Sequence, residues 1–183
     1  MCPAANKSNL GDIVQAASKY PIPNGTPVNA AAASLTTDLE VANAELVFTA
    51  KNKGEAGNNI TVTYVAPDEA EAELAVTVSG TDIIVNLATD VDKAVTTTAA
   101  EVATAVGTHA VAKLLVTVAN KELNNGEGVV KAMAKASLKN GVDGTVGVKW
   151  QQYIDDTYLY VAVADNTIND ANWKRSTLSL ASY

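Results

Sequence analysis

The sequence predicts an α+β protein: a β-rich domain of hairpins packed with one helix, a small C-terminal three-strand β unit and an extended N-terminal arm. Three observations carry this prediction. Apolar and polar residues alternate with period two in several short runs, which is typical of half-buried strands. Only residues 96–110 have the spacing of an amphipathic helix. Five of the nine aromatic residues fall between Trp150 and Trp173, which sets the C-terminal part apart.

We expect residues 1–43 to form the arm. Residues 10–20 fit a short helical or irregular segment. Residues 21–27 contain three prolines, which forbid a helix, and an Asn-Gly pair that suits a tight turn. Residues 30–37 are ambiguous by pattern. We expect this arm to lie over another surface rather than in a core of its own, and to order on assembly if that surface belongs to another molecule.

The β-rich domain is expected at residues 44–142. Residues 45–50 predict its first strand. Residues 60–65 alternate apolar and threonine side chains, which predicts a half-buried second strand. Residues 74–79 and 82–87 alternate in the same way on either side of a glycine turn, and this arrangement predicts a hairpin.

The predicted helix begins at a threonine N-cap, Thr97 or Thr98, and Thr98 and Glu101 have the spacing of a capping box. Small apolar residues form one face, which lets the helix sit close to a sheet. These residues are Ala99, Val102, Ala103, Val106 and Ala110. Residues 114–119 predict a further strand. Residues 129–138 fit either helix or strand, and we predict a strand because glycines bracket the run at strand length.

A glycine-rich linker at residues 142–147 leads to the C-terminal unit, which we place at residues 148–183. Its strands are expected at residues 148–154, 158–164 and 173–178, as a meander. Both faces of the middle strand are apolar or amphipathic. A unit of about 30 residues cannot bury two such faces by itself, so it either docks on the preceding domain or packs against another subunit.

The aromatic side chains of this unit are the candidate functional residues. Tyr and Trp concentrate at protein interfaces, so we predict that they form a subunit contact together with the neighbouring basic pair. The predicted interface residues are Trp150, Tyr153, Tyr158, Tyr160, Trp173, Lys174 and Arg175.

Composition and charge exclude one class of chain and two classes of partner. A share of 48% apolar residues excludes a disordered chain. The net charge of −7 repels phosphate backbones, and the only adjacent basic pair is Lys174 with Arg175, so we expect no nucleic-acid partner. No window has the apolar length of a membrane span and no secretion signal is present, so we expect no membrane partner.

The inventory of reactive residues argues against an enzyme. His109 is the only histidine and Cys2 the only cysteine, so the chain cannot assemble a Cys/His pair or a zinc site. We expect Cys2 to be a free thiol, with intermolecular pairing as the alternative. Residues 141–147 lack the lysine and helix of a phosphate loop, and residues 165–170 lack the central glycine of a calcium loop. We therefore predict no catalytic residues, no cofactor and no metal.

Several stretches resemble known proteins. Those in the C-terminal part resemble the ending of structural proteins of tailed bacteriophages: NGVDGTVG from Asn140, YLYVAVADNT from Tyr158 and ANWKR from Ala171. Two further stretches resemble a module that recurs in phage head-decoration, fibre and tail proteins: AGNNITVT from Ala56 and TAAEVATAV from Thr98. The resemblance covers residues 45–180.

The resemblance implies a non-enzymatic structural component of a phage virion, and first of all a capsid decoration or head-associated protein that stabilises or caps the capsid lattice. Its partners would be the major capsid protein or other virion proteins. It would be a homo-oligomer in the particle, located in the virion after assembly in the host cytoplasm. A tail or head-tail joining protein is the alternative of the same class. A receptor- or carbohydrate-binding module is the alternative of another class, because exposed Trp and Tyr also stack on sugars.

Overall fold

The computed structural model describes residue 22, residues 24–37 and residues 39–178. The segment predicted at residues 10–20 and Cys2 lie outside these residues. The described chain forms two compact units. The large unit spans residues 31–143, and the small unit combines the residues up to Ala30 with those from Gly144 onward.

This division differs from the predicted boundaries. The described residues of the predicted arm do not form a segment of their own. Residues 24–30 belong to the small unit, and the described residues from 31 to 43 belong to the large unit. Residues 24–31 form backbone hydrogen bonds with residues more than 100 positions away, and residues 32–36 pair with a strand later in the chain. Local periodicity does not indicate such pairings.

The first sheet of the large unit has three antiparallel strands. These are β1 (Ala32–Thr36), β2 (Leu46–Lys53) and β6 (Val116–Asn120), in the order β1-β2-β6. A short 3-10 helix, η1 (Glu55–Asn59), follows β2. The strand predicted at residues 45–50 is therefore confirmed, the strand predicted at residues 114–119 is confirmed from Val116 onward, and β1 falls inside the predicted arm.

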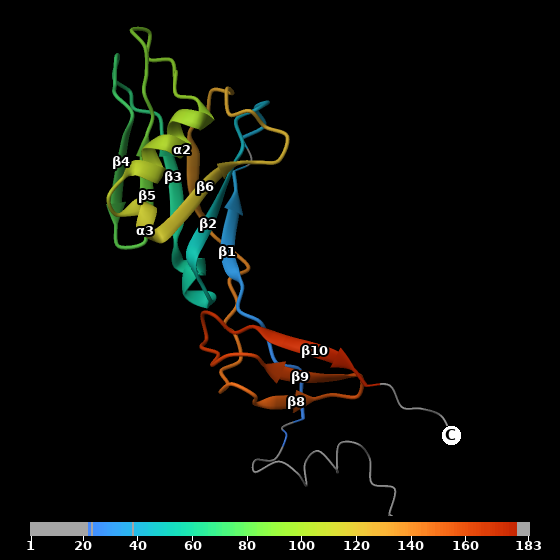
Figure 1. Cartoon of the computed structure of the whole chain (residues 1–183). Coiled ribbons are helices and arrows are strands. Elements are labelled where there is room, and N and C mark those ends of the chain that lie inside the picture. The colour runs from blue at the N-terminus through green and yellow to red at the C-terminus, as the bar shows by residue number, and fades with distance from the viewer. Residues whose placement is uncertain (1–21, 23, 38, 179–183) are drawn as a thin grey trace, which may run out of the picture. The chain divides into compact units, whose positions relative to one another are not determined.

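The second sheet of the large unit is mixed. It contains β3 (Thr61–Val65), β4 (Ala75–Ser79), β5 (Asp82–Asn86) and β7 (Met133–Ser137), in the order β4-β5-β3-β7 (Figure 1). β3 and β5 run parallel, and the other neighbours are antiparallel. The predicted hairpin of β4 and β5 is confirmed, with its turn at Gly80, whose φ of +61° suits a glycine.

The run at residues 129–138 forms a strand over only half of its length. Val62 and Tyr64 of β3 pair with Ala136 and Met133, so β7 contains one extra residue at this point. Such a bulge interrupts the alternation of inward and outward side chains. The side chains of β7 therefore do not alternate strictly, and Met133 and Ala136 are its half-buried residues.

The predicted helix is present as α2 (Ala99–Thr108), and its capping box is confirmed. The Thr98 hydroxyl accepts a hydrogen bond from the Glu101 amide, and the Glu101 carboxylate accepts one from the Thr98 amide. The helix packs against β6 and β4 with its buried residues Ala99, Val102 and Val106. A single further turn, α3 (Ala112–Leu115), leads directly into β6.

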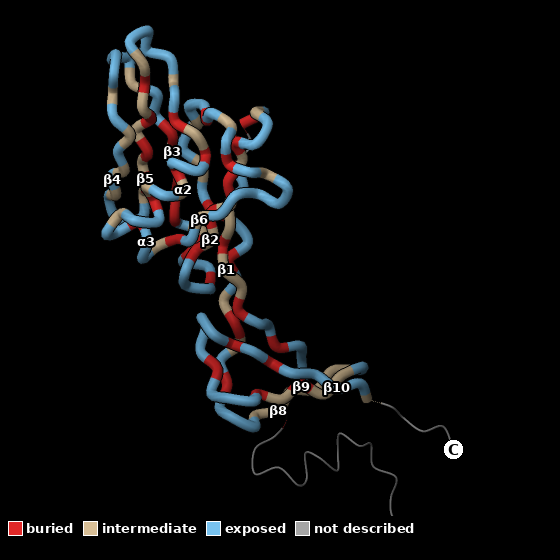
Figure 2. Tube along the Cα trace, turned by 45° about the horizontal axis from the view of Figure 1, so that its top comes forward, coloured by how far each residue is buried: buried red, intermediate tan, exposed pale blue. Residues whose placement is uncertain are grey.

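One apolar core holds the large unit together. Both sheets and α2 contribute to it, and Figure 2 shows the buried residues along the inner strands. The rings of Phe48 and Tyr64, one from each sheet, are 6.4 Å apart. The largest fully buried side chains are Tyr64, Phe48, Leu46, Ile83, Leu87, Leu138, Val62, Val85, Val102, Val106, Val116 and Val130. Each aliphatic side chain in this set contributes roughly 1.5–3 kcal/mol by leaving water.

The small unit contains the predicted meander. Its strands are β8 (Gln152–Ile154), β9 (Tyr158–Ala162) and β10 (Trp173–Thr177), antiparallel and in the order β10-β9-β8. The described residues contain ten strands in three sheets and one main helix, so the predicted α+β class is confirmed.

Candidate functional site

The small unit has an aromatic core of its own. Trp173, Tyr160 and Ala162 are buried there together with Ala30 and Ala171. The Trp173 ring meets Tyr153 edge to face at 5.1 Å, and its indole N–H donates to the Thr145 carbonyl at 2.9 Å. One apolar face of the meander is therefore buried by residues of the same unit.

A glycine is required where the chain passes this core. A Cβ built on Gly147 would lie 2.6 Å from the Trp173 ring. Any side chain at this position would displace the indole. The glycine-rich run predicted as a linker is therefore partly a packing element.

Residues 24–30 complete the small unit. The Gly25 amide donates to the Ile154 carbonyl at 2.9 Å, and the Ala30 amide donates to the Ala171 carbonyl at 3.1 Å. The Trp173 amide donates to the Asn29 side-chain oxygen at 2.5 Å. The unit is therefore assembled from two stretches that lie more than 100 residues apart in sequence.

Asp155 connects these two stretches at the first turn of the meander. Its carboxylate accepts hydrogen bonds from the Thr157 amide at 2.8 Å, the Tyr160 hydroxyl at 2.7 Å, the Tyr158 amide at 2.7 Å and the Thr26 hydroxyl at 2.9 Å. These donors, the Thr157 amide first, hold the pKa of Asp155 at about 2. The hydrogen bond between Tyr160 and Asp155 raises the pKa of the Tyr160 hydroxyl.

Two predicted interface residues have another role. Tyr160 and Trp173 are 5% and 4% exposed, and both belong to the core of the small unit. Tyr160 lies on β9, and Trp173 lies on β10 opposite Ala162, so the two side chains share one face of the meander. Neighbours from the same unit already pack that face, and the prediction of a subunit contact differs from this arrangement at these two residues.

The other predicted interface residues are at least partly exposed. Tyr153 and Tyr158 are half-buried at the margin of the core. Lys174 and Arg175 are exposed on β10, and the Arg175 guanidinium lies over the Tyr158 ring at 4.4 Å from its centre. Arg175 is therefore engaged within the unit, in contact with another residue of the predicted set.

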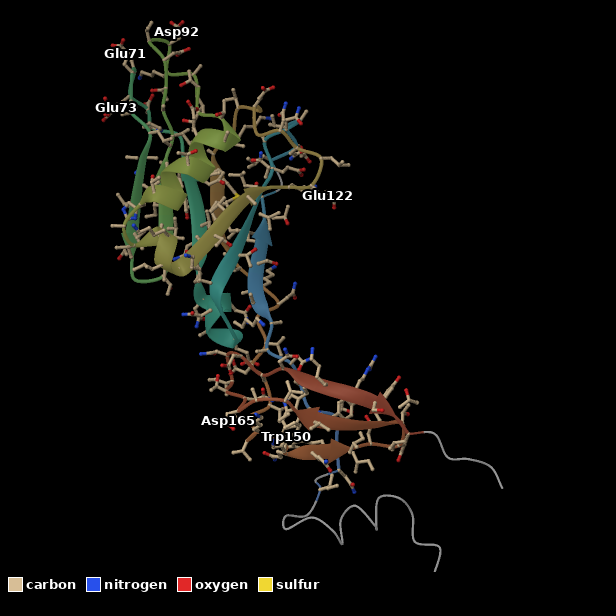
Figure 3. All side chains as sticks on the ribbon, in the orientation of Figure 1. Glu71, Glu73, Asp92, Glu122, Trp150 and Asp165 are labelled. Carbon is tan, nitrogen blue, oxygen red and sulfur yellow. The ribbon has the colours of Figure 1, made fainter. Side chains whose placement is uncertain are left out.

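Trp150 is the most exposed aromatic residue of the predicted set, with 67% of its surface accessible. Its backbone φ is +71°, which is strained for a bulky residue. The Lys149 ammonium lies 5.3 Å from the centre of its ring. Figure 3 shows Trp150 near Asp165, whose carboxylate accepts a hydrogen bond from the Lys149 amide at 2.7 Å.

Three exposed valines, which the sequence pattern did not indicate, belong to the C-terminal part of the small unit. Val146, Val148 and Val163 are 58%, 66% and 43% exposed. Gly147 faces Trp173, so the valines on either side of it point away from the core. The Trp150 amide donates to the Ala162 carbonyl at 2.7 Å, which places the backbone of Trp150 beside the start of Val163, the residue that follows Ala162. We call these four exposed apolar residues of the small unit, Val146, Val148, Trp150 and Val163, the outer apolar cluster.

The described residues contain little reactive chemistry. No group of three His, Cys, Asp or Glu side chains is placed to hold a metal ion within residues 24–37 and 39–178. The His109 ring accepts hydrogen bonds from the Val111 and Ala112 amides at 3.3 and 3.2 Å, so it caps the turn α3. In the described part of the chain no helix is long and apolar enough to cross a membrane.

The segment at residues 165–170 forms a turn through its own side chains. The Thr167 amide and hydroxyl both donate to the Asp170 carboxylate, at 2.7 and 2.5 Å. This is the polar turn expected from an Asx-rich sequence.

Comparisons of the chain with protein-family models, with curated proteins and with solved structures find no match.

Proposed function

We propose that this protein is a non-enzymatic structural component of a phage virion, a capsid decoration or head-associated protein that stabilises or caps the capsid lattice through protein contacts. The resemblance of residues 140–147, 158–167 and 171–175 to the endings of phage structural proteins supports this function. In the fold these stretches lead into the small unit, form β9 and begin β10. The small unit, which holds most of these stretches, also exposes Trp150 and several valines.

The observation that carries the proposal is the exposed ring of Trp150. A tryptophan that is 67% exposed and held in a strained backbone conformation is costly unless a contact uses it. Tryptophan is among the residues that dominate binding energy at interfaces, and the valines of the outer apolar cluster would exclude water around it. The partner would be the major capsid protein or another virion protein.

The charge of the chain fits such a role. A net charge of −7 keeps a protein soluble at the high local concentration of a capsid shell and favours a basic partner surface.

A second candidate, a receptor- or carbohydrate-binding module, is favoured by the same residue. An exposed indole with an ammonium group 5.3 Å from its centre can stack on a sugar ring and leave a hydrogen-bond donor beside it. A tail or head-tail joining component, the alternative of the same class, would bind its virion partner through the same outer apolar cluster.

The proposal is tested by mixing the full-length protein with capsids that lack it, and separately with purified tails and a glycan array. Wild-type protein should bind capsids saturably at lattice stoichiometry. Trp150→Ala should weaken this binding by about 2–4 kcal/mol, the usual range for a central aromatic residue. Leu123→Ala, at the most exposed apolar residue of the large unit, is the matched control and should bind like wild type.

Other results would contradict the proposal. Binding to tails but not to capsids would favour the joining role. Glycan binding that depends on Trp150, without affinity for capsids, would favour the second candidate and overturn a decoration role.

A further inference from the structure

The strand β4 leaves one edge of the mixed sheet open. It is the outermost strand in the order β4-β5-β3-β7, and Figure 1 shows it at the margin of the sheet. It contains no charged residue, whereas β7 carries Lys135 and β10 carries Lys174 and Arg175. Natural proteins usually guard edge strands with such charges, because an open strand pairs readily with another chain.

The remaining edges of the large unit are partly occupied. The outer side of β1 forms bridges from Ala31 to Val142 and from Ser34 to Lys139. β6 also lacks charged residues, and the following loop lies close to its last residue, where a Cβ on Gly126 would lie 2.9 Å from the Asn120 side chain. Among the described strands of this unit, β4 is an uncharged edge strand with no strand or bridge on its outer side.

The register of the hairpin shows which backbone groups of β4 face outward. Ser79 pairs with Asp82 across a two-residue turn, and Thr77 pairs with Ile84. In such a hairpin these are the pairs that exchange hydrogen bonds, and the residues between them do not. The amide and carbonyl groups of Val76 and Val78 therefore point toward the open edge.

This edge is complementary to itself. If a second copy of β4 lies antiparallel with Thr77 opposite Thr77, Val76 of each copy faces Val78 of the other. Both residues present outward amide and carbonyl groups, so each of these pairs can exchange two hydrogen bonds. The arrangement has the two-fold symmetry of a closed dimer.

The side chains around this axis are compatible with pairing. Thr77 is exposed and would meet its own copy, and Thr-Thr is a favourable cross-strand pair. In the same register Glu73 would face Thr81, and Leu74 would face Gly80, which has no side chain to obstruct it. No like charges oppose each other across the seam in spite of the net charge of −7.

The surface beside β4 is also apolar. A shallow depression on the helix side is lined by Leu74, Ala100, Glu101, Thr104 and Ala105. A two-fold axis perpendicular to the sheet would bring both copies of α2 to the same face and cover this depression. Val76 and Val78, half-buried in one copy, would then be enclosed.

We propose that β4 is a self-association surface, through which two copies of this chain pair antiparallel about Thr77 and join their four-stranded sheets into one. This inference does not depend on the virion role, and it assigns self-association to the large unit, whereas the outer apolar cluster belongs to the small unit. The occupant of the edge is a second copy of the same chain.

The first test measures the mass of the full-length protein by sedimentation over a range of concentrations. Wild type should form a dimer. Thr77→Lys places two positive charges opposite each other and should raise the dissociation constant at least about tenfold. Thr77→Glu should do the same, and an equal mixture of the two variants should restore the dimer. Thr117→Lys, at an exposed position of β6, is the matched control and should leave the mass unchanged.

The second test is covalent. In an antiparallel pair without hydrogen bonds the two Cα atoms lie about 4.5 Å apart, which permits a disulfide. Thr77→Cys in a Cys2→Ser background should therefore form a cross-linked dimer under mild oxidation, and Thr117→Cys should not. Circular dichroism checks that each variant folds.

Three results would overturn the proposal. One is a wild-type protein that stays monomeric at all concentrations while Thr77→Cys fails to cross-link. Another is a dimer whose mass responds to Thr117→Lys rather than to Thr77→Lys. The third is a dimer that Trp150→Ala dissociates and Thr77→Lys does not.

Discussion

The two units of this protein are stabilised in different ways. The large unit is one continuous stretch, residues 31–143, and its core consists mainly of valine, leucine and isoleucine from two sheets and a helix. The small unit combines two separate stretches, and its described residues include six buried apolar side chains, five of which, Tyr160 and Trp173 among them, form one cluster. With so little apolar surface to bury, the small unit depends on specific hydrogen bonds, and Asp155 accepts four of them.

This difference can be measured because the chain carries a selective reporter. Both of its tryptophans, Trp150 and Trp173, belong to the small unit. Tryptophan fluorescence therefore follows the small unit, while far-ultraviolet circular dichroism is dominated by the helix and the two sheets of the large unit.

The largest expected effect is the loss of the small unit when residues 1–30 are removed. This deletion takes away the hydrogen-bond partners at Gly25, Thr26, Asn29 and Ala30. We expect the tryptophan emission of the shortened chain to match that of the unfolded chain. A fragment of residues 31–143 should still unfold cooperatively in circular dichroism, because its core lies within that stretch.

Removal of residues 1–21 alone is the control for this experiment, since it leaves those hydrogen bonds in place. Native tryptophan emission after removal of residues 1–30 would show that the N-terminal stretch is dispensable, and would remove the main distinction between the two units.

A smaller loss of stability of the small unit is expected at acid pH and in the variant Asp155→Asn. The folded pKa of Asp155, about 2, lies below the value of about 3.9 for an unfolded chain, so the unfolded state takes up the proton first. The stability from this carboxylate is complete above about pH 4 and is lost as the pH falls toward 2. Tryptophan fluorescence during urea unfolding should therefore show the small unit weakening across this window in wild type.

Asp155→Asn should lower the urea midpoint of the small unit at pH 7 and flatten its dependence on pH between 4 and 2, because the charge is absent in both states. Asp156→Asn, at the exposed neighbouring residue, is the control and should keep the wild-type profile. Identical profiles for Asp155→Asn and wild type would mean that this carboxylate does not anchor the turn.

The smallest expected effect is a change in stability of opposite sign when one tyrosine in each unit is replaced by phenylalanine. The Tyr64 hydroxyl is buried in the large unit without a hydrogen-bond partner, and burial raises its pKa. Tyr64→Phe removes an unsatisfied polar group and should raise the free energy of unfolding of the large unit by about 1 kcal/mol. Tyr160→Phe removes the bond to Asp155 and should lower the stability of the small unit.

Urea unfolding followed by circular dichroism for Tyr64→Phe and by fluorescence for Tyr160→Phe checks both signs. A loss of stability in Tyr64→Phe would indicate that its hydroxyl has a partner in solution, such as a buried water.

The elements that depend on neighbouring residues were predictable from the sequence. The capping box of Thr98 and Glu101 and the hairpin around Gly80 involve residues a few positions apart, so their spacing specifies them. The parallel pairing of β3 with β5 was not predictable, because a strand pattern does not name its partner. The pairing of β1 and the position of residues 24–30 depend on contacts over long separations in the same way.

The candidate site was predictable in part. Aromatic clustering indicated Trp150, which is exposed, but also Trp173 and Tyr160, which are buried. Tryptophan is suited to both environments, so residue type alone does not separate them. The clue to the exposed valines was the glycine at position 147 between Val146 and Val148: a residue without a side chain faced the core, and its neighbours had to face outward.

The composition of the small unit from two distant stretches has a consequence for biosynthesis. On the ribosome, the large unit can fold once residue 143 has left the exit tunnel, whereas residues 24–30 must wait for β8, β9 and β10. For as long as that delay lasts, Ala30 and Asn29 lack the partners that hold them in the finished protein. The last strand to be synthesised thus completes the environment of some of the first residues, and the small unit forms only after nearly the whole described chain has been made.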